Sequence, residues 1–350
     1  MIAMSGGVDS SVAALLMKEA GHDCLGVMLH LYDNEDAGLP PARTCCSLGD
    51  AEDARAVAYR LGMPFYVFNF TGEFREQVIG RFVDDYEHGR TPNPCIECNR
   101  RLKFGKLLRR AAELECDALA TGHYARIERE DGRYLLKKAF DSTKDQSYVL
   151  YMLTQEQLAH LCFPLGALRK AETRRIAARA GFANARKRDS QDICFVPDGD
   201  YARAVERHAG KPCPPGDFVD GEGRVLGRHA GVVHYTVGQH RGLGLSLPTR
   251  SCVCAILPES NTVVLGSERD LYADSLTAGE FHWISGEVPV APLRVKAKIR
   301  YRQPEQPALV TPLGRYAVRV TFDEPQRAVT PGQAVVLYDG DTVLGGGIIR

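Results

Sequence analysis

A glycine-rich run near the start of the sequence has the residue types needed to hold a phosphate. Ser5-Gly6-Gly7-Val8-Asp9-Ser10-Ser11 lies between a short apolar stretch and a helical pattern. Two consecutive glycines let the backbone approach a phosphate, the free N–H groups of the following helix attract anions, and the serines add hydroxyl donors. Asp9 is a candidate Mg²⁺ ligand. The run has neither the lysine of a Walker A loop nor the dinucleotide fingerprint.

The length of this run decides between two interpretations. Ser5-Gly6-Gly7 by itself is typical of a turn. The full seven residues resemble the PP-loop signature of the adenine nucleotide alpha hydrolase group, whose members cleave ATP to AMP and pyrophosphate. The resemblance implies ATP and Mg²⁺ as ligands and leaves the second substrate open.

A Cys-x-x-Cys motif, Cys95-Ile96-Glu97-Cys98, precedes a predicted basic helix. The helix dipole and the nearby arginines predict a lowered thiol pKa, and hence a reactive thiol. A structural zinc site is the alternative. It requires a second cysteine pair at metal-ligand spacing, which neither Cys45-Cys46 nor Cys252-x-Cys254 provides.

Another cysteine, Cys194, follows the acidic segment 189–192 and a basic stretch. By itself it is typical of a packing cysteine. The chain has eleven cysteines and no secretory leader, which argues against a disulfide framework and favours thiol or metal chemistry at a few positions.

Charge and composition indicate a cytoplasmic enzyme. Lys plus Arg equals Asp plus Glu at 44 each, so any attraction for nucleic acid must come from local clusters. We find no apolar run long enough to cross a bilayer. Basic residues gather in two blocks, for which solvated helix faces are the alternative interpretation: Arg100, Arg101, Lys103, Lys106, Arg109 and Arg110, and Arg169, Lys170, Arg174, Arg175, Arg179, Arg186, Lys187 and Arg188.

The elements that position these residues follow from hydrophobic periodicity. The first 120 residues alternate strand and helix patterns, which predicts an α/β, Rossmann-like parallel sheet covered by helices on both faces. The basic helix is expected from about Asn99, a hairpin at Asp131-Gly132, and helix over about 155–180.

After residue 192 the pattern changes to short strands separated by turns. This predicts a small central domain and a C-terminal β-barrel-like domain. We place the PP-loop domain at 1–194, a mainly β central domain at 195–267, and the barrel-like domain at 268–350.

Several short motifs occur in one order along the chain. They are the glycine-rich loop, Cys45-Cys46-Ser47, Asn93-Pro94, Cys98-Asn99, Gly122-His123-Tyr124, Lys144-Asp145-Gln146-Ser147, Cys194-Phe195, Tyr235-Thr236-Val237-Gly238-Gln239, Arg241-Gly242-Leu243-Gly244, Arg300-Tyr301 and Thr330-Pro331-Gly332-Gln333. This ordered set closely resembles the tRNA-specific 2-thiouridylase family over nearly the whole chain.

The resemblance implies an ATP-dependent sulfurtransferase that 2-thiolates the wobble uridine, position 34, of tRNA. Family members adenylate the C2 oxygen, release pyrophosphate and then replace the oxygen with sulfur. By match of motif, Cys194 carries the sulfur as a persulfide, and Cys98 is its partner thiol in persulfide and disulfide chemistry. The implied partners are tRNA and a sulfur-carrier or cysteine desulfurase relay protein.

The resemblance also assigns binding residues. It implies ATP-phosphate contacts at Ala3, Met4, Ser5, Gly6, Gly7, Val8, Asp9 and Ser10, and adenosine contacts at Leu29 and Gly122. It implies tRNA contacts, with the flipped base at the first three, at Asn93, Pro94, Cys95, His123, Lys144, Asp145, Gln146, Arg300, Tyr301 and Gln333. His123 by itself is typical of a structural residue at a strand end.

The sequence departs from the family pattern at Cys95, where many members carry an aspartate that is a candidate general base. Two interpretations stay open. A Cys95 thiolate could replace the carboxylate, or Cys95, Cys98 and Cys194 could hold a [4Fe-4S] cluster with one open iron site.

Two rival functions remain. One is another PP-loop ATP enzyme, either an amidotransferase-type synthetase or a thiolase of another tRNA position. The other is a non-catalytic tRNA-binding or metal-binding protein, against which Asp9, Cys98 and Cys194 argue.

Overall fold

A five-stranded parallel sheet forms the N-terminal part of the protein, described from a computed structural model over residues 1–38, 48–187, 189, 193–246 and 250–350. The strand order is β3-β2-β1-β4-β7. The bounds are β1 Ile2–Ala3, β2 Gly26–His30, β3 Phe65–Asn69, β4 Leu119–Thr121 and β7 Leu161–Cys162. The chain moves outward from β1 in both directions, so the ends of β1 and β4 form the switch point at which open α/β sheets bind ligands.

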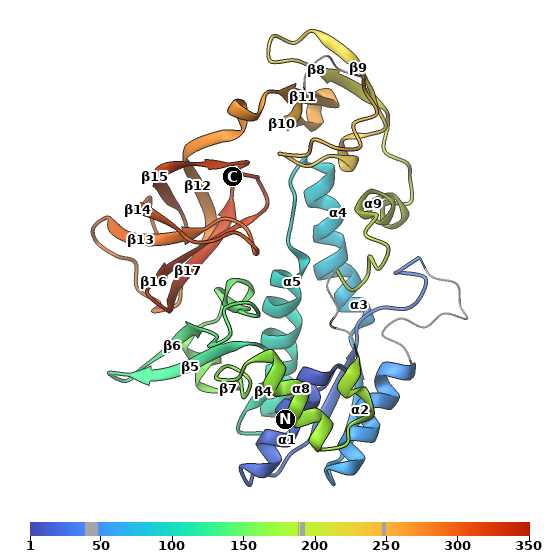
Figure 1. Ribbon diagram of the computed structural model, residues 1–350, viewed down its shortest axis with the longest axis vertical. Helices are drawn as coiled ribbons and strands as arrows, with labels where there is room; N and C mark the ends of the chain where they lie inside the picture. The colour runs from blue at the N-terminus through green and yellow to red at the C-terminus, as the bar shows by residue number, and fades with distance from the viewer. Residues whose placement is uncertain (39–47, 188, 190–192, 247–249) are drawn as a thin grey trace.

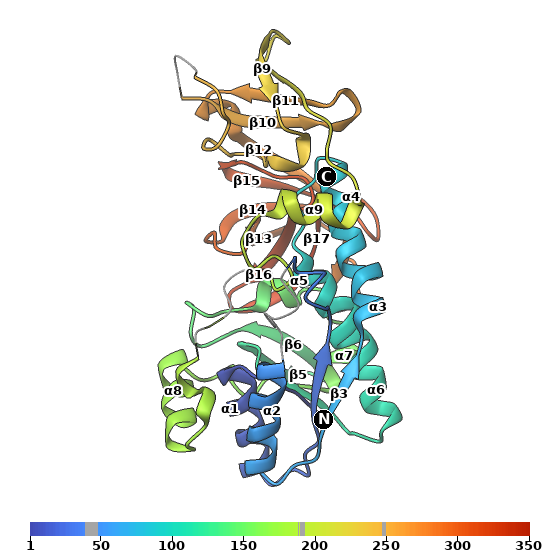
Figure 2. The same ribbon diagram turned by 90° about the vertical axis from the view of Figure 1, so that its right-hand side faces the viewer.

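Helices cover both faces of this sheet because its residues alternate between two cores. Ile2 and Ala120 contact the core under α1 (Val8–Glu19), α2 (Leu48–Arg60) and α8 (Lys170–Arg179). Met1 and Leu119 face the opposite core. Figure 2 shows α1, α2 and α8 on one side of the strands and α3 and α6 on the other. The predicted α/β fold is confirmed.

Two long helices connect the sheet to the rest of the molecule. One comprises α3 (Thr71–Phe74), a π-type segment Arg75–Ile79 and α4 (Gly80–Glu87). The other comprises α5 (Pro94–Glu97), a π-type segment Cys98–Leu107 and α6 (Leu108–Glu113). No helix in the described part of the chain has the length and apolar content that crossing a membrane requires.

The basic helix begins earlier than the sequence indicated. Its first residue is Pro94 rather than a residue near Asn99. Asn93 caps it, because its Oδ1 accepts a hydrogen bond from the Cys95 N–H at 3.1 Å, and proline suits the first helical position. Cys95 and Cys98 therefore both lie in the helix.

The predicted helix over 155–180 is wrong in its middle. The structure has α7 (Gln155–Ala159), then β7, and only then α8. Leu161 pairs with Leu119 at the sheet edge. Pro164 and Gly166 follow, and neither residue favours helix interiors.

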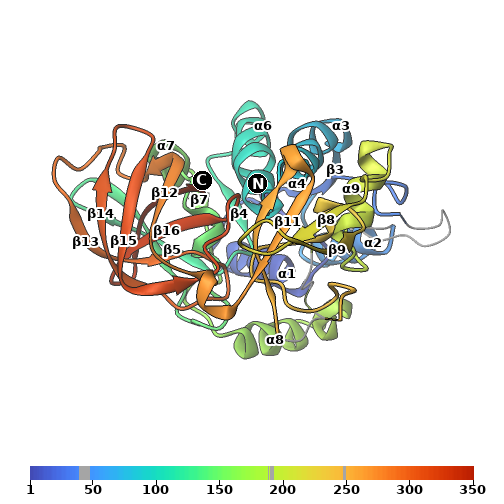
Figure 3. The ribbon, with the colours of Figure 1, turned by 90° about the horizontal axis from the view of Figure 1, so that it is seen from above.

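The C-terminal half contains two β-rich units. A four-stranded sheet of order β10-β11-β8-β9 comes first, followed by a six-stranded antiparallel barrel that the β12–β17 pairing closes. Figures 1 and 3 show the barrel to one side of α4, and Figure 1 shows the four-stranded sheet beyond the end of α4. The predicted β-barrel-like domain is confirmed.

The remaining elements complete the chain. The strands are β5 Ala125–Glu130, β6 Arg133–Lys138, β8 Gly216–Val219, β9 Val225–His229, β10 Cys252–Leu257, β11 Thr262–Gly266, β12 Tyr272–Trp283, β13 Leu293–Lys298, β14 Gln306–Pro312, β15 Val318–Arg327, β16 Ala334–Asp339 and β17 Thr342–Ile349. The helical segments are α9 Tyr201–Ala209 and short 3-10 turns at Ser147–Leu150, Ala183–Arg186, Val232–His234, Pro258–Ser260 and Glu268–Leu271.

The β5–β6 hairpin attaches the N-terminal part to the barrel. Asp131 and Gly132 have φ values of 49° and 79°, as a tight primed turn requires, so the predicted hairpin is confirmed. Lys137 of β6 pairs with Thr342 of β17, which extends the barrel sheet. Lys138 Nζ lies 3.0 Å from Glu305 Oε1 of the barrel.

The three parts of the chain meet at Thr91, just before the Cys95 helix. The Thr91 N–H donates to the Pro331 carbonyl at 2.8 Å, and the Thr91 carbonyl accepts from Gln333 Nε2 at 2.7 Å. The Thr91 and Thr236 hydroxyls lie 3.4 Å apart. Gly332 has a φ of 89°, and a Cβ there would lie 2.8 Å from Thr91 N.

Gly332→Ala should therefore destabilise the protein by about 1–3 kcal/mol more than Gly286→Ala. Gly286 has a φ of 81° and nothing within 4 Å of an added Cβ, so the control shares the backbone strain without the clash. Scanning calorimetry measures both variants. Equal losses of melting temperature would contradict a tight junction at Thr91.

Candidate active site

The glycine-rich loop has the shape of an anion site at the start of α1. Gly6 has a φ of 72°, and a Cβ there would collide with the Asp50 backbone carbonyl. Gly7 is the residue that precedes the first turn of α1. The first N–H groups of α1 therefore face the loop without a side chain in the way.

The hydroxyls of Ser10 and Ser11, expected to donate to a phosphate, bond to the loop backbone in this structure. Ser10 and Ser11 are buried, and their hydroxyls donate to the Gly7 carbonyl at 3.1 and 2.9 Å. The Ser5 N–H donates to Ser10 Oγ at 3.1 Å. In this conformation the two hydroxyls hold the loop in shape instead of pointing outward as phosphate donors.

Gly122 approaches the loop from the neighbouring strand, as the switch-point position predicts. A Cβ on Gly122 would lie 2.8 Å from Ser10 N, so the contact requires glycine. Leu29 lies near the end of β2, paired with Phe68 of β3. The structure thus brings Gly122 against the loop and places Leu29 on the strand next to β1.

Two side chains that the sequence analysis did not single out as site residues also support the loop. Asn184 Nδ2 donates to the Gly6 carbonyl at 3.0 Å and to Ser11 Oγ at 2.9 Å. Lys187 lies 3.3 Å from the Gly6 carbonyl and forms ion pairs with Asp50 and, at 2.6 Å, Asp53. Both are remote in sequence, and only the basic block around Lys187 gave any signal.

Asp9, the candidate Mg²⁺ ligand, lies in a cluster of ion pairs. Lys170 Nζ lies 2.7 Å from both Asp9 carboxylate oxygens and 2.8 Å from Asp189 Oδ1. Lys144 and Arg174 also reach Asp189, at 2.9 and 2.7 Å. Burial raises the pKa of Asp189, but hydrogen bonds from Lys170 and Lys144 outweigh it and lower the pKa to about 2. Tyr124 donates its hydroxyl to Asp9 at 2.9 Å.

The helix with Cys95 and Cys98 does not activate its thiols as predicted. Burial raises the pKa of Cys98 to about 11, and Lys103 lowers it only in part. Cys95 reaches the surface, yet the protein packed around it also raises its pKa. The expectation of lowered thiol pKa values is wrong for this conformation, because loss of water outweighs the helix dipole.

Glu97, which lies between the two cysteines, explains why the nearby arginines do not lower the thiol pKa values. Its buried carboxylate forms ion pairs with Arg100 at 3.1 Å, Arg101 at 3.3 Å and Arg81 at 3.7 Å. Arg81 and Arg100 also reach Glu280 of the barrel, at 2.7 and 3.6 Å. The carboxylates of Glu97 and Glu280 therefore offset the positive charge of these arginines, which leaves little attraction to stabilise a cysteine thiolate.

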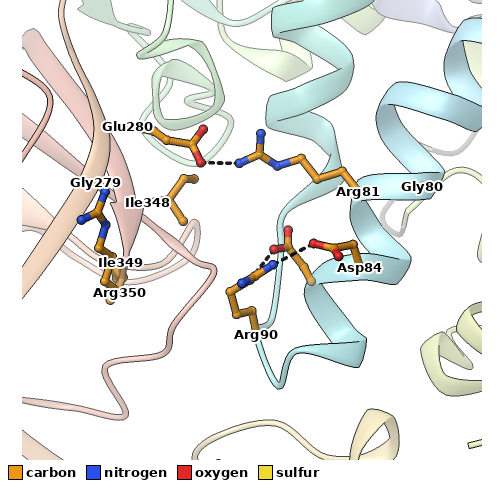
Figure 4. Close-up of a pocket in the computed structure, with 10 residues that line it drawn as sticks. Gly80, Arg81, Asp84, Arg90, Gly279, Glu280, Ile348, Ile349 and Arg350 are labelled. Carbon is orange, nitrogen blue, oxygen red and sulfur yellow. Dashed lines mark hydrogen bonds and ion pairs between the residues drawn. The ribbon is translucent and has the colours of Figure 1, made fainter. Parts of the chain in front are cut away.

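The cavity beside this network is separate from the glycine-rich loop. It has a volume of about 550 Å³ and lies between α4 and the barrel. Figure 4 shows Arg81 facing Glu280 across it and Arg90 facing Asp84. Two of the arginines that line this cavity, Arg81 and Arg90, already have carboxylate partners.

Cys194 is exposed, in contrast to the buried Cys98. Its position is held by its neighbours: its carbonyl accepts a 2.6 Å hydrogen bond from the Tyr32 hydroxyl, and the Phe195 ring packs against Phe74 and Phe82. Residues 190–192 of this motif and Cys45-Cys46 lie outside the described residues.

The interpretation of Cys95, Cys98 and Cys194 as ligands of a [4Fe-4S] cluster is not supported by their positions. Among the described residues, Cys95, Cys98 and Cys194 included, no group of three His, Cys, Asp or Glu side chains comes close enough to hold a metal ion. The geometry of this conformation therefore does not provide the three thiolate ligands that the cluster interpretation requires.

The residues predicted to contact tRNA fall into two groups. Seven of them are buried or bonded within the protein, although only Pro94 and His123 are fully buried. Asn93 caps the helix and Pro94 is buried, His123 is buried with a 2.7 Å bond to Thr121, Asp145 accepts from Ser147, Gln146 accepts from the Tyr124 N–H, Arg300 binds Thr330 at 2.6 Å, and Gln333 binds Thr91.

The other three have exposed or partly exposed side chains. Lys144 is partly exposed beside Asp189, Cys95 is exposed, and Tyr301 is 37% exposed. Burial raises the pKa of Tyr301, and the charges of Asp145 and Cys95 raise it by smaller amounts.

Comparisons with known proteins agree with this arrangement. The chain matches the family models described as tRNA methyl transferase HUP domain over residues 1–198, tRNA methyl transferase PRC-barrel domain over 203–267, and aminomethyltransferase beta-barrel domain over 273–349.

Curated relatives match over the whole chain. The tRNA-specific 2-thiouridylase MnmA of Clostridioides difficile is 49% identical and covers 100% of this chain and 97% of the relative. That of Moorella thermoacetica is 53% identical over 100% and 99%. The solved U34-tRNA thiolase NcsA from Methanococcus maripaludis with its [4Fe-4S] cluster is 18% identical, covers 58% of this chain and 62% of that chain, and has a TM-score of 0.34, too remote to carry an argument. On the full-length identity to the curated relatives, the chain belongs to the tRNA-specific 2-thiouridylase family.

Proposed function

We propose that this chain, a PP-loop sulfurtransferase that acts on uridine in tRNA, replaces the C2 oxygen of the wobble uridine with sulfur by adenylation followed by persulfide attack. The observation that carries the proposal is the agreement with relatives named tRNA-specific 2-thiouridylase over their whole length. The glycine-rich loop alone would leave the acceptor of the adenylyl group open.

The first step activates the uridine. Its C2 oxygen attacks the α-phosphorus of ATP, the bond to the β-phosphate oxygen breaks, pyrophosphate leaves, and the ring loses its N3 proton. The backbone of residues Ala3 to Ser10 binds the phosphates, the Asp9 carboxylate would hold Mg²⁺, and Leu29 and Gly122 contact the adenosine. The loop conformation, the N–H groups of α1 and the surrounding lysines support these roles.

The second step delivers sulfur. The terminal sulfur of a Cys194 persulfide attacks C2, and the C2–O bond breaks as AMP leaves. Cys98 then attacks Cys194 Sγ, the persulfide S–S bond breaks, and 2-thiouridine is released with a Cys98–Cys194 disulfide that an external thiol reduces. The exposure of Cys194 fits loading by a sulfur-carrier or cysteine desulfurase relay protein.

The burial of Cys98 fits a thiol that stays unreactive until the substrate is bound. A pKa of about 11 keeps it protonated at neutral pH, which protects it until the substrate changes its surroundings. The raised pKa of Cys95 argues against a standing thiolate that replaces the family's aspartate. We propose that Cys95 instead contacts the flipped base together with Asn93, Pro94 and Tyr301, whose ring offers a stacking surface.

Pyrophosphate release should depend on the acceptor. With Mg²⁺ and labelled ATP, we expect pyrophosphate only when tRNA with an unmodified wobble uridine is present, because that oxygen is the attacking group. Addition of a sulfur donor should then release AMP and increase the nucleoside mass by that of sulfur minus oxygen. Stimulation by a small amide acceptor, or by tRNA whose wobble base is not uridine, would favour the rival PP-loop enzymes.

Cys194→Ser should abolish thiolation while tRNA affinity stays within about threefold, because a serine cannot hold a persulfide but removes no charge. Gel-shift titration and nucleoside mass spectrometry measure the two effects. Cys116→Ser, at a partly exposed thiol in the turn after α6, is the matched control and should remain active.

Two results would overturn this assignment. Full thiolation by Cys194→Ser would remove Cys194 from the sulfur path. Anaerobically purified protein that contains iron and acid-labile sulfide, and that loses both in Cys194→Ser but not in Cys116→Ser, would favour the cluster.

Alkylation of Cys98 should be slow at neutral pH and should rise by about tenfold per pH unit up to its pKa near 11, because only the thiolate reacts. Lys103→Gln should slow it further, since the Lys103 charge stabilises that thiolate. Mass spectrometry of the Cys98 peptide after timed iodoacetamide labelling measures the rate. A plateau below pH 8 would contradict the raised pKa.

A further inference from the structure

Lys170 combines deep burial with contacts to two carboxylates beside the glycine-rich loop. Its side chain is only 10% exposed, and its Nζ has three carboxylate oxygens within 2.8 Å, two from Asp9 and one from Asp189. Asp141 fixes the start of α8 by accepting the Lys170 N–H at 2.9 Å. The ammonium is therefore held at the end of a packed helix.

The pairing of Lys170 with Asp9 is incompatible with the full use of Asp9 as a metal ligand. An Mg²⁺ ion on the Asp9 carboxylate would face the Lys170 ammonium at the same oxygens, and like charges at such a distance repel. A buried ammonium that loses a carboxylate requires another anion in its place. Asp189 alone does not suffice, because Lys144 and Arg174 already share it.

We propose that Lys170 exchanges the Asp9 carboxylate for the β- and γ-phosphates of ATP when Mg²⁺ and ATP bind, and that it thereby stabilises the leaving pyrophosphate. Without nucleotide, Lys170 neutralises Asp9. With nucleotide, the Asp9 carboxylate would hold Mg²⁺, and the released Lys170 ammonium pairs with the phosphate oxygens. When the bond between the α-phosphorus and the β-phosphate oxygen breaks, the electron pair goes to pyrophosphate, whose added charge Lys170 offsets. The inference deepens the proposed function and rests on it.

Lys187 is the other lysine next to the loop, and its contacts assign it a different role. It pairs with Asp50 and Asp53 of α2 and with the Gly6 carbonyl, so it joins α2 to the loop backbone. Neither acid is the candidate metal ligand. Binding of Mg²⁺ at Asp9 therefore releases Lys170 but leaves the partners of Lys187 in place.

A reactive nucleotide tests this on the unmodified protein. In an ATP that carries an acyl group on its γ-phosphate, a neighbouring lysine nitrogen attacks the acyl carbon, an amide forms and ATP leaves, while the ammonium loses two protons to the buffer. Peptide mapping should find the acyl group on Lys170, with labelling blocked by excess ATP but not by the same concentration of AMP. ATP-sensitive labelling of Lys187 or Lys144, with Lys170 unmodified, would overturn the proposal.

Variants provide the quantitative test. Lys170→Gln removes the charge but keeps an amide that can bond to Asp9 and Asp189, and it should weaken Mg²⁺·ATP binding by about tenfold or more. AMP has no β- or γ-phosphate, so its affinity should change by less than about threefold. A merely structural role would weaken both nucleotides alike.

The matched control is Arg174→Gln. It also removes a cationic partner of Asp189 at 2.7 Å but no partner of Asp9, so its ATP affinity should stay within about threefold of the unmodified protein. Equal losses of ATP affinity in the two variants would refute the exchange. If Lys170→Gln does not fold, the labelling result on the unmodified protein decides alone.

Failure of the proposed function gives a different result. In that case the unmodified protein would neither bind Mg²⁺·ATP in calorimetry nor take up the label at any lysine. Binding of Mg²⁺·ATP with tRNA-dependent AMP formation, but with ATP affinity unchanged in Lys170→Gln, would refute only the role of Lys170.

Discussion

The ion pair between Lys170 and Asp9 is the contact on which the nucleotide end of the molecule depends. It joins the first turn of α1 to the first turn of α8, and through Asp189 it reaches the segment that leads to Cys194. A buried ammonium that loses its carboxylate partner destabilises the fold. If α1 and α8 move apart, Lys170 and Asp9 therefore each need a new partner of opposite charge. The same contact therefore stabilises the loop and makes it responsive to an incoming anion and cation.

At the two candidate sulfur-transfer cysteines, Cys98 and Cys194, the degree of burial separates their chemistry. Cys98 lies in a helix whose arginines are already paired with Glu97, and the lack of water raises its pKa to about 11. Cys194, by contrast, is exposed on a segment anchored by Phe195. The two thiols thus differ in access and in proton affinity, which fits one thiol that receives sulfur from outside and another that acts only inside a substrate complex.

The arrangement of the domains explains why residues far apart in sequence can serve one substrate. Thr91 bonds to Pro331 and Gln333 and lies beside Thr236, so the start of the Cys95 helix is held by both β-rich units. The β5–β6 hairpin makes a second attachment to the barrel. Several predicted tRNA contacts, such as Gln333 and Arg300, maintain this junction, while Tyr301 and Lys144 present side chains to solvent.

The sequence by itself determined the α/β class, the barrel-like end, the loop at the start of α1 and the set of motifs that identifies the family, because these depend on local periodicity and on residue types at fixed spacing. It placed the start of the Cys95 helix too late and missed β7, since an Asn93 cap and a two-residue strand leave little periodic signal. Only the tertiary structure decided the chemistry of individual side chains. Lys170 appeared as one member of a basic block, and Cys98 as an activated thiol. Segments distant in the chain supply the carboxylates that pair with Lys170. The protein packed around Cys98 excludes water and thereby raises the pKa of its thiol.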